Sequence, residues 1–154
     1  MAKASRVEVL VEDERHQRFV RRYLYSLGYS GHDIHFEDLP SGKGSGEQWV
    51  RVNYAKAVRV YRARHARAET ALVPAIDSDN GDSDRRTQQL QSALIQAALT
   101  PRAVDERIAH LIPKRNIETW ILCLNGKTVD ENTDYSQEGG IDDQIRPAAA
   151  TFFA

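Results

Sequence analysis

The sequence predicts an α/β fold with a central, mostly parallel four-stranded sheet covered by helices. Short runs rich in apolar and β-branched residues alternate along the chain with longer segments that carry an apolar stripe at helical spacing. Each helical pattern follows a strand pattern, which is the order that crossover connections use to build a parallel sheet. The length of 154 residues suits one domain with a full core.

Four short runs are the expected strands of this sheet. Val7–Val11 (VEVLV) is the first, and Ile34–Leu39 (IHFEDL) is the second. Thr70–Ile76 is the third, and Pro74 inside it indicates a strand end or an edge strand, because proline has no N–H to donate. Arg107–Ile112 (RIAHLI) is the fourth.

Four amphipathic helices are expected after these strands. In each, the apolar residues recur at offsets of three and four, which places them on one helix face. The four sets are Phe19, Val20, Tyr23, Leu24 and Leu27; Val50, Tyr54, Ala57, Val58 and Tyr61; Leu90, Leu94, Ala97 and Ala98; and Ile117, Trp120, Ile121 and Leu124. We expect these faces to pack on the sheet.

The chain is expected to divide after residue 129. Residues 1–129 would form the α/β domain, and residues 130–154 an acidic tail with a short terminal helix. Six acids and no Lys or Arg lie between Asp130 and Asp143, and the following run RPAAATFFA is apolar. The chain stops soon after Arg146, which allows that a C-terminal portion is missing.

The composition excludes several classes of protein. With 28% charged and 41% hydrophobic residues, wholesale disorder is not expected. No apolar stretch approaches the roughly 18 to 20 residues that span a bilayer, and the N-terminus lacks the apolar run of a signal peptide. The single cysteine cannot form an internal disulfide. We therefore expect a cytoplasmic protein with no membrane partner.

Acidic residues follow two of the expected strands directly. Glu12 comes after the first strand, and Asp77 and Asp79 come after the third. Because parallel strands end at one edge of the sheet, these three carboxylates should converge there and raise at least one pKa. A hard divalent cation relieves such repulsion. The sequence thus predicts a site for Mg²⁺ or Mn²⁺ with Glu12, Asp77 and Asp79 as ligands.

A plainer interpretation makes the run DSDNGDSD a polar turn before a helix. Ser83 or Asp84 would then be the N-cap of that helix. This interpretation explains Asp82 to Asp84 well, but it explains Asp77 less well, because Asp77 follows directly on an apolar strand.

The run LVED after the first strand and the run IDSD after the third resemble the Toprim domain of small nucleases, primases and topoisomerases. The resemblance implies a Rossmann-like three-layer sandwich. It also implies that Glu12 is a metal ligand or general base in phosphodiester chemistry, and that Asp77 and Asp79 are metal ligands. The runs PSGKGSG and PKRNIETW are similar to small bacterial Toprim-like proteins of the RloB and overcoming-lysogenization-defect groups, which implies phage defence with an ATPase partner.

Residues near the fourth strand are further candidates for catalysis. Glu118 in RNIETW is either a fourth carboxylate of the site or an ordinary acid in a first helical turn, and the two interpretations are even. Lys114 and Arg115 precede it and would neutralise a transition-state phosphate, or they are ordinary surface cations.

Basic residues elsewhere are candidates for nucleic-acid contacts. Arg51, Arg59 and Arg62 share one side of the second helix and would suit phosphates, although most such faces are simply solvated. Lys43 lies in the loop PSGKGSG, which fails the Walker pattern but could touch a nucleic-acid backbone. His32 and His35 have no third His or Cys nearby, so we expect structural or surface histidines.

The leading hypothesis is a metal-dependent nuclease that hydrolyses DNA or RNA, with an ATPase partner or as a homo-oligomer. One alternative is a receiver-like phosphoacceptor domain, with Asp77 as the acceptor and Lys114 as its lysine. Another is a non-catalytic module that binds nucleic acid or an ATPase through its basic helix.

Overall fold

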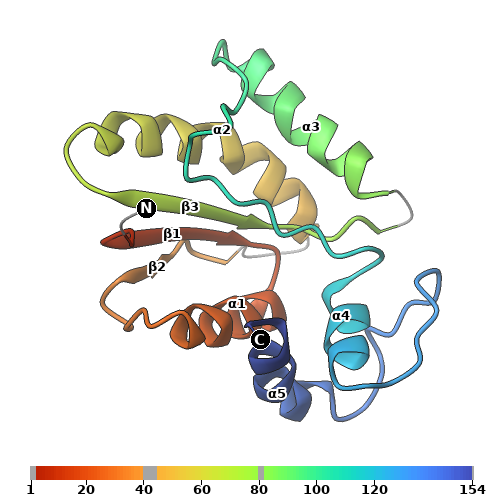
Figure 1. Ribbon diagram of the computed structural model, residues 1–154. Helices are drawn as coiled ribbons and strands as arrows, with labels where there is room; N and C mark the ends of the chain where they lie inside the picture. The colour runs from red at the N-terminus through yellow and green to blue at the C-terminus, as the bar shows by residue number, and fades with distance from the viewer. Residues whose placement is uncertain (1–2, 40–44, 80–81, 154) are drawn as a thin grey trace.

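The computed structural model of the protein describes residues 3–39, 45–79 and 82–153 (Figure 1). Within these ranges, the strands are β1 (Arg6–Val11), β2 (Ile34–Phe36) and β3 (Thr70–Ala75). The helices are α1 (Glu14–Ser26), α2 (Gly46–His65), α3 (Ser83–Gln96), α4 (Ile117–Leu124) and α5 (Ile141–Phe153). Strands and helices alternate as far as α3, so the predicted α/β class is confirmed.

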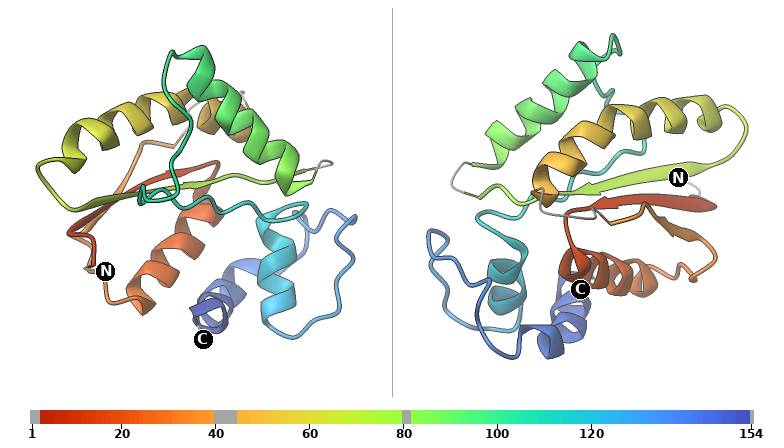
Figure 2. Two further views of the ribbon diagram at one scale, coloured as in Figure 1. Left: turned by 45° about the horizontal axis from the view of Figure 1, so that its top comes forward. Right: turned by 180° about the vertical axis from the view of Figure 1, so that it is seen from behind.

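The sheet is parallel and has the strand order β2-β1-β3. Alternate residues of β1 face opposite sides: Val9 packs toward α1, whereas Leu10 belongs to a cluster with α2 and α3. Figure 2 shows α2 and α3 on one side of the sheet and α1, α4 and α5 on the other. The centre of the sheet is therefore covered on both faces, and β1 is its middle strand.

The predicted four-stranded sheet is not confirmed, because the sheet of the described residues has three strands. The segment Arg107–Ile112 runs beside β3 but forms only isolated parallel bridges, at Ile108 and Leu111. The N–H of Leu111 donates to the Pro74 carbonyl at 2.9 Å, but Pro74 has no N–H to donate in return. The ladder is interrupted there. The edge position that Pro74 predicted for its strand is confirmed, since β3 is an edge of the sheet.

The expected terminal helix is α5, and it packs against α1 and α4. Ile141 and Ile145 of α5 are buried in one apolar cluster with Phe19 of α1 and Ile121 of α4. The ring of Phe152 lies 5.2 Å from the ring of Trp120, measured between centroids. The last helix is thus part of a core that includes the helix following β1.

Polar residues cap the helices next to the carboxyl edge of the sheet. Asp13 accepts a hydrogen bond from the N–H of His16 at the start of α1, and Asn116 accepts one from Thr119 in α4. The N-cap of α3 is Asp82, so the prediction of Ser83 or Asp84 is wrong by one or two residues. Among the described residues, no helix combines the length and the apolar character needed to cross a membrane.

Candidate metal centre

The ends of β1 and β3 bring Glu12 and Asp77 into direct contact. The backbone N–H of Asp77 donates to Oε1 of Glu12 at 2.6 Å. Asp77 is only 7% exposed. This is the convergence that two adjacent parallel strands produce at their carboxyl ends, and it places both carboxylates at one point of the sheet edge.

His16 of α1 lies between two carboxylates of the same site. Its Nε2 is 2.9 Å from Oδ1 of Asp77, and its Nδ1 is 2.9 Å from Oδ1 of Asp13. The ring is fully buried, which opposes protonation, but the charges of Asp77 and Asp13 and their hydrogen bonds outweigh this and raise the pKa of His16 well above its ordinary value. The imidazole is therefore held as a cation against Asp77.

The two carboxyl groups of the pair are both hard to ionise. Burial, and then the charge of Asp77, raises the pKa of Glu12 to about 8. Burial also raises the pKa of Asp77, although His16 acts in the opposite direction. Ligand atoms of Glu12, His16 and Asp77 all lie within 4.8 Å of one another, so Glu12 and Asp77 could hold a metal ion, and His16 could join them only after losing its proton. Two carboxylates that repel each other in a buried place fit a divalent cation.

Asp79, the third expected ligand, is turned toward Arg86. Its Oδ2 accepts from Nη2 of Arg86 at 3.1 Å, and its side chain is 55% exposed. Its backbone has a positive φ of 53°, which redirects the chain directly after the buried Ser78. The charge of Asp79 still contributes to the raised pKa of Glu12. Within the described ranges, the ligand group around Glu12 contains Asp77 and His16, and Asp79 is not in it.

Arg86 of α3 organises the loop after β3. It is buried, and its Nε donates to the backbone carbonyl of Asp77 at 2.8 Å. Its Nη1 donates to Glu47 of α2 and to Gln89, each at 2.7 Å. One guanidinium therefore fixes Asp77 and Asp79 relative to two helices.

Glu118, the candidate fourth carboxylate, is 5% exposed and lies at the same edge. Its Oε1 accepts from Nη1 of Arg15 at 2.6 Å. Its charge contributes to the raised pKa of Asp77, which places it within electrostatic reach of the centre. Glu118 is therefore buried at the start of α4 and paired with a partly buried arginine, which distinguishes it from an ordinary exposed acid in a first helical turn.

The two basic residues before α4 have different roles in the structure. Nζ of Lys114 is paired with Glu131 at 2.7 Å on the surface. The N–H of Arg115 donates to Oγ of Ser78 at 2.9 Å, and its carbonyl accepts from the N–H of Asp79 at 2.8 Å. The backbone of Arg115 thus fixes the loop that carries Asp77 and Asp79.

The three arginines of α2 all contact groups of the protein. Arg51 is paired with Glu47 at 2.7 Å, and Arg62 with Glu106 at 2.6 Å. Nη2 of Arg59 lies 3.4 Å from the carbonyl of Ala97. Of the three, Arg51 is beside the candidate centre, because it lines a hollow of about 310 Å³ with Asp79 and Arg85. The remaining candidate, Lys43, lies outside the described residues.

Sequence reasoning missed His16, Arg86 and Arg15 as parts of the site. His16 sits in the first turn of α1, the helix that begins just after the end of β1. That position next to Glu12 is the signal that could have identified it. Arg15 gave no such signal, because its partner Glu118 is 103 residues away in the sequence. Arg86 reaches the carbonyl of Asp77 by folding back across the loop before α3, which no local pattern indicates.

The chain was compared with protein-family models, with curated proteins and with solved structures. None of the three comparisons gives a match. The resemblance of the LVED and IDSD runs to the Toprim domain stays a prediction.

Proposed function

We propose that the protein is a metal-dependent nuclease that hydrolyses phosphodiester bonds of DNA or RNA. The observation that carries the proposal is the contact between Glu12 and Asp77 at the carboxyl edge of the sheet, where both have raised pKa values. Buried carboxyl groups of this kind cluster at functional sites, because ionising them without a counter-charge costs stability. Mg²⁺ or Mn²⁺ held by Glu12 and Asp77 is the proposed cofactor.

Each residue of the centre has a proposed role that follows from its contacts. A bound divalent cation would lower the pKa of a water ligand and offset charge on the phosphodiester. Glu12 and Asp77 supply the ligand oxygens, and His16 orients the Asp77 carboxylate through Oδ1. Arg86 fixes the backbone of Asp77 through its carbonyl. Glu118, held by Arg15, is the buried carboxylate at this edge of the sheet whose proposed role is to position a water molecule.

The hollow beside Asp79 is the proposed entrance for the phosphate backbone. Arg51 and Arg85 line it together with Ser78 and Asp79. Cations placed next to a phosphodiester site bind nucleic acid through its phosphates, and the affinity falls as salt is added. Arg85, which is exposed in the first turn of α3, is the cation that we add to the predicted set.

The biological setting is proposed on the resemblance alone. The protein is proposed to act in the cytoplasm, in phage defence, together with an ATPase partner. It is proposed to act as a single chain or as a homo-oligomer. The contacts of the centre bear on the chemistry and not on this setting.

A cleavage assay tests the proposed function. Labelled single-stranded DNA, duplex DNA and RNA are incubated with the protein in Mg²⁺, Mn²⁺ or EDTA, beside the variants Asp77→Asn and Asp84→Asn. Asp84 is exposed in the first turn of α3, so its variant is the matched control. We expect metal-dependent cleavage that is lost at least 100-fold in Asp77→Asn and kept in Asp84→Asn, the scale of a missing metal ligand.

Two outcomes would contradict the nuclease. Cleavage that survives in EDTA or in Asp77→Asn would place the activity elsewhere. Binding of Mn²⁺ without cleavage of any substrate would favour the receiver-like or the non-catalytic alternative.

A further inference from the structure

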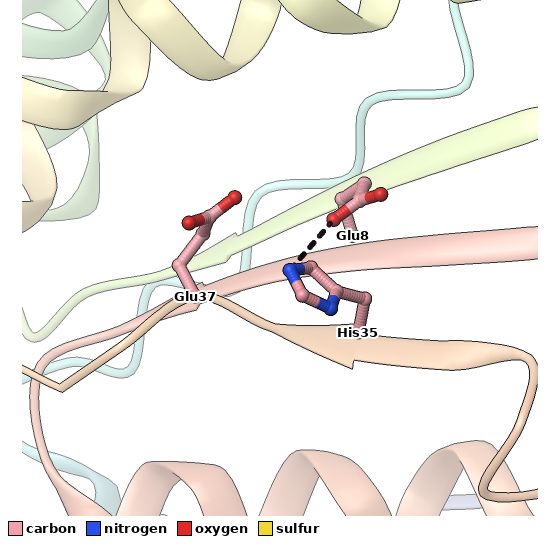
Figure 3. A group of neighbouring side chains, drawn as sticks. All are labelled: Glu8, His35 and Glu37. Atoms are coloured by element: carbon pink, nitrogen blue, oxygen red, sulfur yellow. Dashed lines mark ion pairs between the residues drawn. The ribbon is translucent and has the colours of Figure 1, made fainter.

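A second group of side chains that could hold a metal ion includes a residue of β1, away from the end of the strand that Glu12 follows (Figure 3). Glu8 comes from β1, His35 from β2, and Glu37 follows β2 directly. Their ligand atoms all lie within 4.8 Å of one another. Figure 3 shows the imidazole of His35 turned toward the carboxylate of Glu8, with the Glu37 carboxylate on the same side of the sheet.

Glu8 is held in place by two arginines. It is 8% exposed, and its Oε1 accepts from Nε of Arg6 at 2.5 Å and from Nη1 of Arg64 at 3.1 Å. Its other oxygen, Oε2, faces Nε2 of His35 at 3.8 Å. That separation is too long for a hydrogen bond and close to the spacing of two ligands on one metal ion. The arginines act as outer partners that orient the carboxylate.

A cavity opens beside these side chains, between the sheet and α2. Its volume is about 200 Å³, and Glu8, His35 and Glu37 line it together with Trp49 and Asn53. Water occupies roughly 30 Å³ per molecule in the liquid, so the cavity has room for an ion and for waters that complete its coordination. His35 and Glu37 are exposed, which gives an ion a path from solvent.

We propose that Glu8, His35 and Glu37 form a second divalent-cation site, selective for Zn²⁺ and similar transition metals over Mg²⁺. An imidazole nitrogen with two carboxylate oxygens is a donor set for Zn²⁺, whereas Mg²⁺ prefers oxygen ligands alone. The two carboxylates match the charge of the ion. Arg6 and Arg64 lower the affinity by repulsion, so we expect dissociation constants in the micromolar range or weaker.

The second site is structural or regulatory, and it does not supply a second ion to the candidate centre. Glu8 lies in β1 and Glu12 directly follows that strand, four residues further along, which is roughly 13 Å of extended chain. Paired catalytic ions lie only about 3.5 to 4 Å apart. An ion at Glu8, His35 and Glu37 would instead join β1 to β2, which is a strand of three residues at the edge of the sheet.

Metal titration tests the second site independently of the nuclease. Zn²⁺ is added at pH 7 to the wild type and to His35→Gln and His32→Gln, and heat is recorded by calorimetry. Co²⁺ absorption serves as a second readout, because the position and intensity of its visible bands report the ligand set and the coordination geometry. His32 is an exposed histidine three residues away and outside the group, so it is the matched control.

We expect His35→Gln to lose one equivalent of Zn²⁺ and the matching Co²⁺ band, and His32→Gln to keep both. Glu37→Gln should weaken the same equivalent at least tenfold, and circular dichroism verifies that each variant is folded. Equal binding by wild type and folded His35→Gln would overturn the proposal. Loss of the Zn²⁺ equivalent in His32→Gln but not in His35→Gln would also overturn it. The proposed nuclease predicts unchanged Mg²⁺-dependent cleavage by His35→Gln, so either proposal can fail without the other.

Discussion

The Nε2 atom of His16 lies 2.9 Å from Oδ1 of Asp77, although 61 residues separate the two in the chain. The imidazole is fully buried, and its other nitrogen contacts Asp13, which caps the same helix. A cation from α1 thus balances the carboxylate that follows β3. The contact joins the first helix to the candidate centre.

Replacing His16 by alanine should destabilise the protein strongly. Asp77 would lose its cationic partner and a buried hydrogen bond; breaking a buried pair costs up to about 3 to 5 kcal/mol, and protonation of Asp77 recovers part of that cost. Chemical denaturation with and without Mn²⁺ measures the free energy of unfolding, and Mn²⁺ should restore more stability to His16→Ala than to the wild type. The exposed His32→Ala is the control and should change stability by less than about 0.5 kcal/mol. A loss below about 1 kcal/mol in His16→Ala would contradict the role assigned to the contact.

Metal affinity at the candidate centre should rise with pH. The pKa of Glu12 is raised to about 8 by burial and by Asp77, so below that pH the folded, metal-free carboxyl is protonated. A metal must displace this proton, and the affinity for Mn²⁺ should therefore increase up to tenfold per pH unit from pH 6 to about 8 and then level off. Calorimetry in buffers of different ionisation heat counts the released proton. Affinity that is constant from pH 6 to 9 would exclude Glu12 as a ligand.

Gly46→Ala should displace Glu12. A Cβ at position 46 would overlap the backbone oxygen of Glu12, which forces Glu12 and the start of α2 apart. Overpacking of this kind costs about 1 to 3 kcal/mol, and here it also moves a proposed metal ligand. Thermal unfolding and Mn²⁺ titration should both register the change. Gly139→Ala, where a Cβ meets no atom within 4 Å, is the control and should match the wild type.

The stability of the fold should fall in mild acid because of His110. Burial, and then the charge of Arg102, lowers the pKa of His110 to about 4, and the hydroxyl of Tyr54 lies 2.8 Å from its Nε2. The unfolded chain takes up this proton near pH 6.5, so the contribution of His110 is complete above that pH and is lost toward pH 4. The free energy of unfolding should change by less than about 1.4 kcal/mol per pH unit over this range, because the ring is partly exposed. Urea unfolding of His110→Phe and wild type at pH 4 to 7 measures the difference, and parallel profiles would refute it.

Local patterns predicted most elements because their causes are local. The apolar stripe from Ile117 to Leu124 coincides with α4, and the expected first and third strands differ from β1 and β3 by one residue. The fourth strand failed for a reason that the pattern cannot show. Whether the missing N–H of Pro74 breaks a ladder depends on which neighbour faces it.

The sequence predicted only those residues of the candidate site whose positions are set by the ends of the strands. Glu12 and Asp77 meet because their strands are adjacent and parallel, which the alternating order implies. Asp79 turns to Arg86 through a positive φ and a tertiary ion pair, and neither can be deduced from the spacing of two aspartates. His35 was expected to be a structural or surface histidine, because no third His or Cys is near it in the sequence. Its acidic neighbour Glu8 lies on another strand, so the sequence does not show that the two meet.

Arg15 connects the last part of the chain to the candidate centre. Besides Glu118 of α4, its guanidinium contacts Oδ1 of Asp142 in α5 at 3.1 Å and the carbonyl of Ser136 at 3.2 Å. A chain cut after residue 129 would lose two of these three acceptors together with the apolar contacts of α5. The side chain of Arg15 would then no longer be held in one orientation, and neither would the side chain of Glu118 that it binds. Substitutions in the acidic tail should thus alter the rate of the proposed reaction, although no tail residue is proposed to touch the substrate.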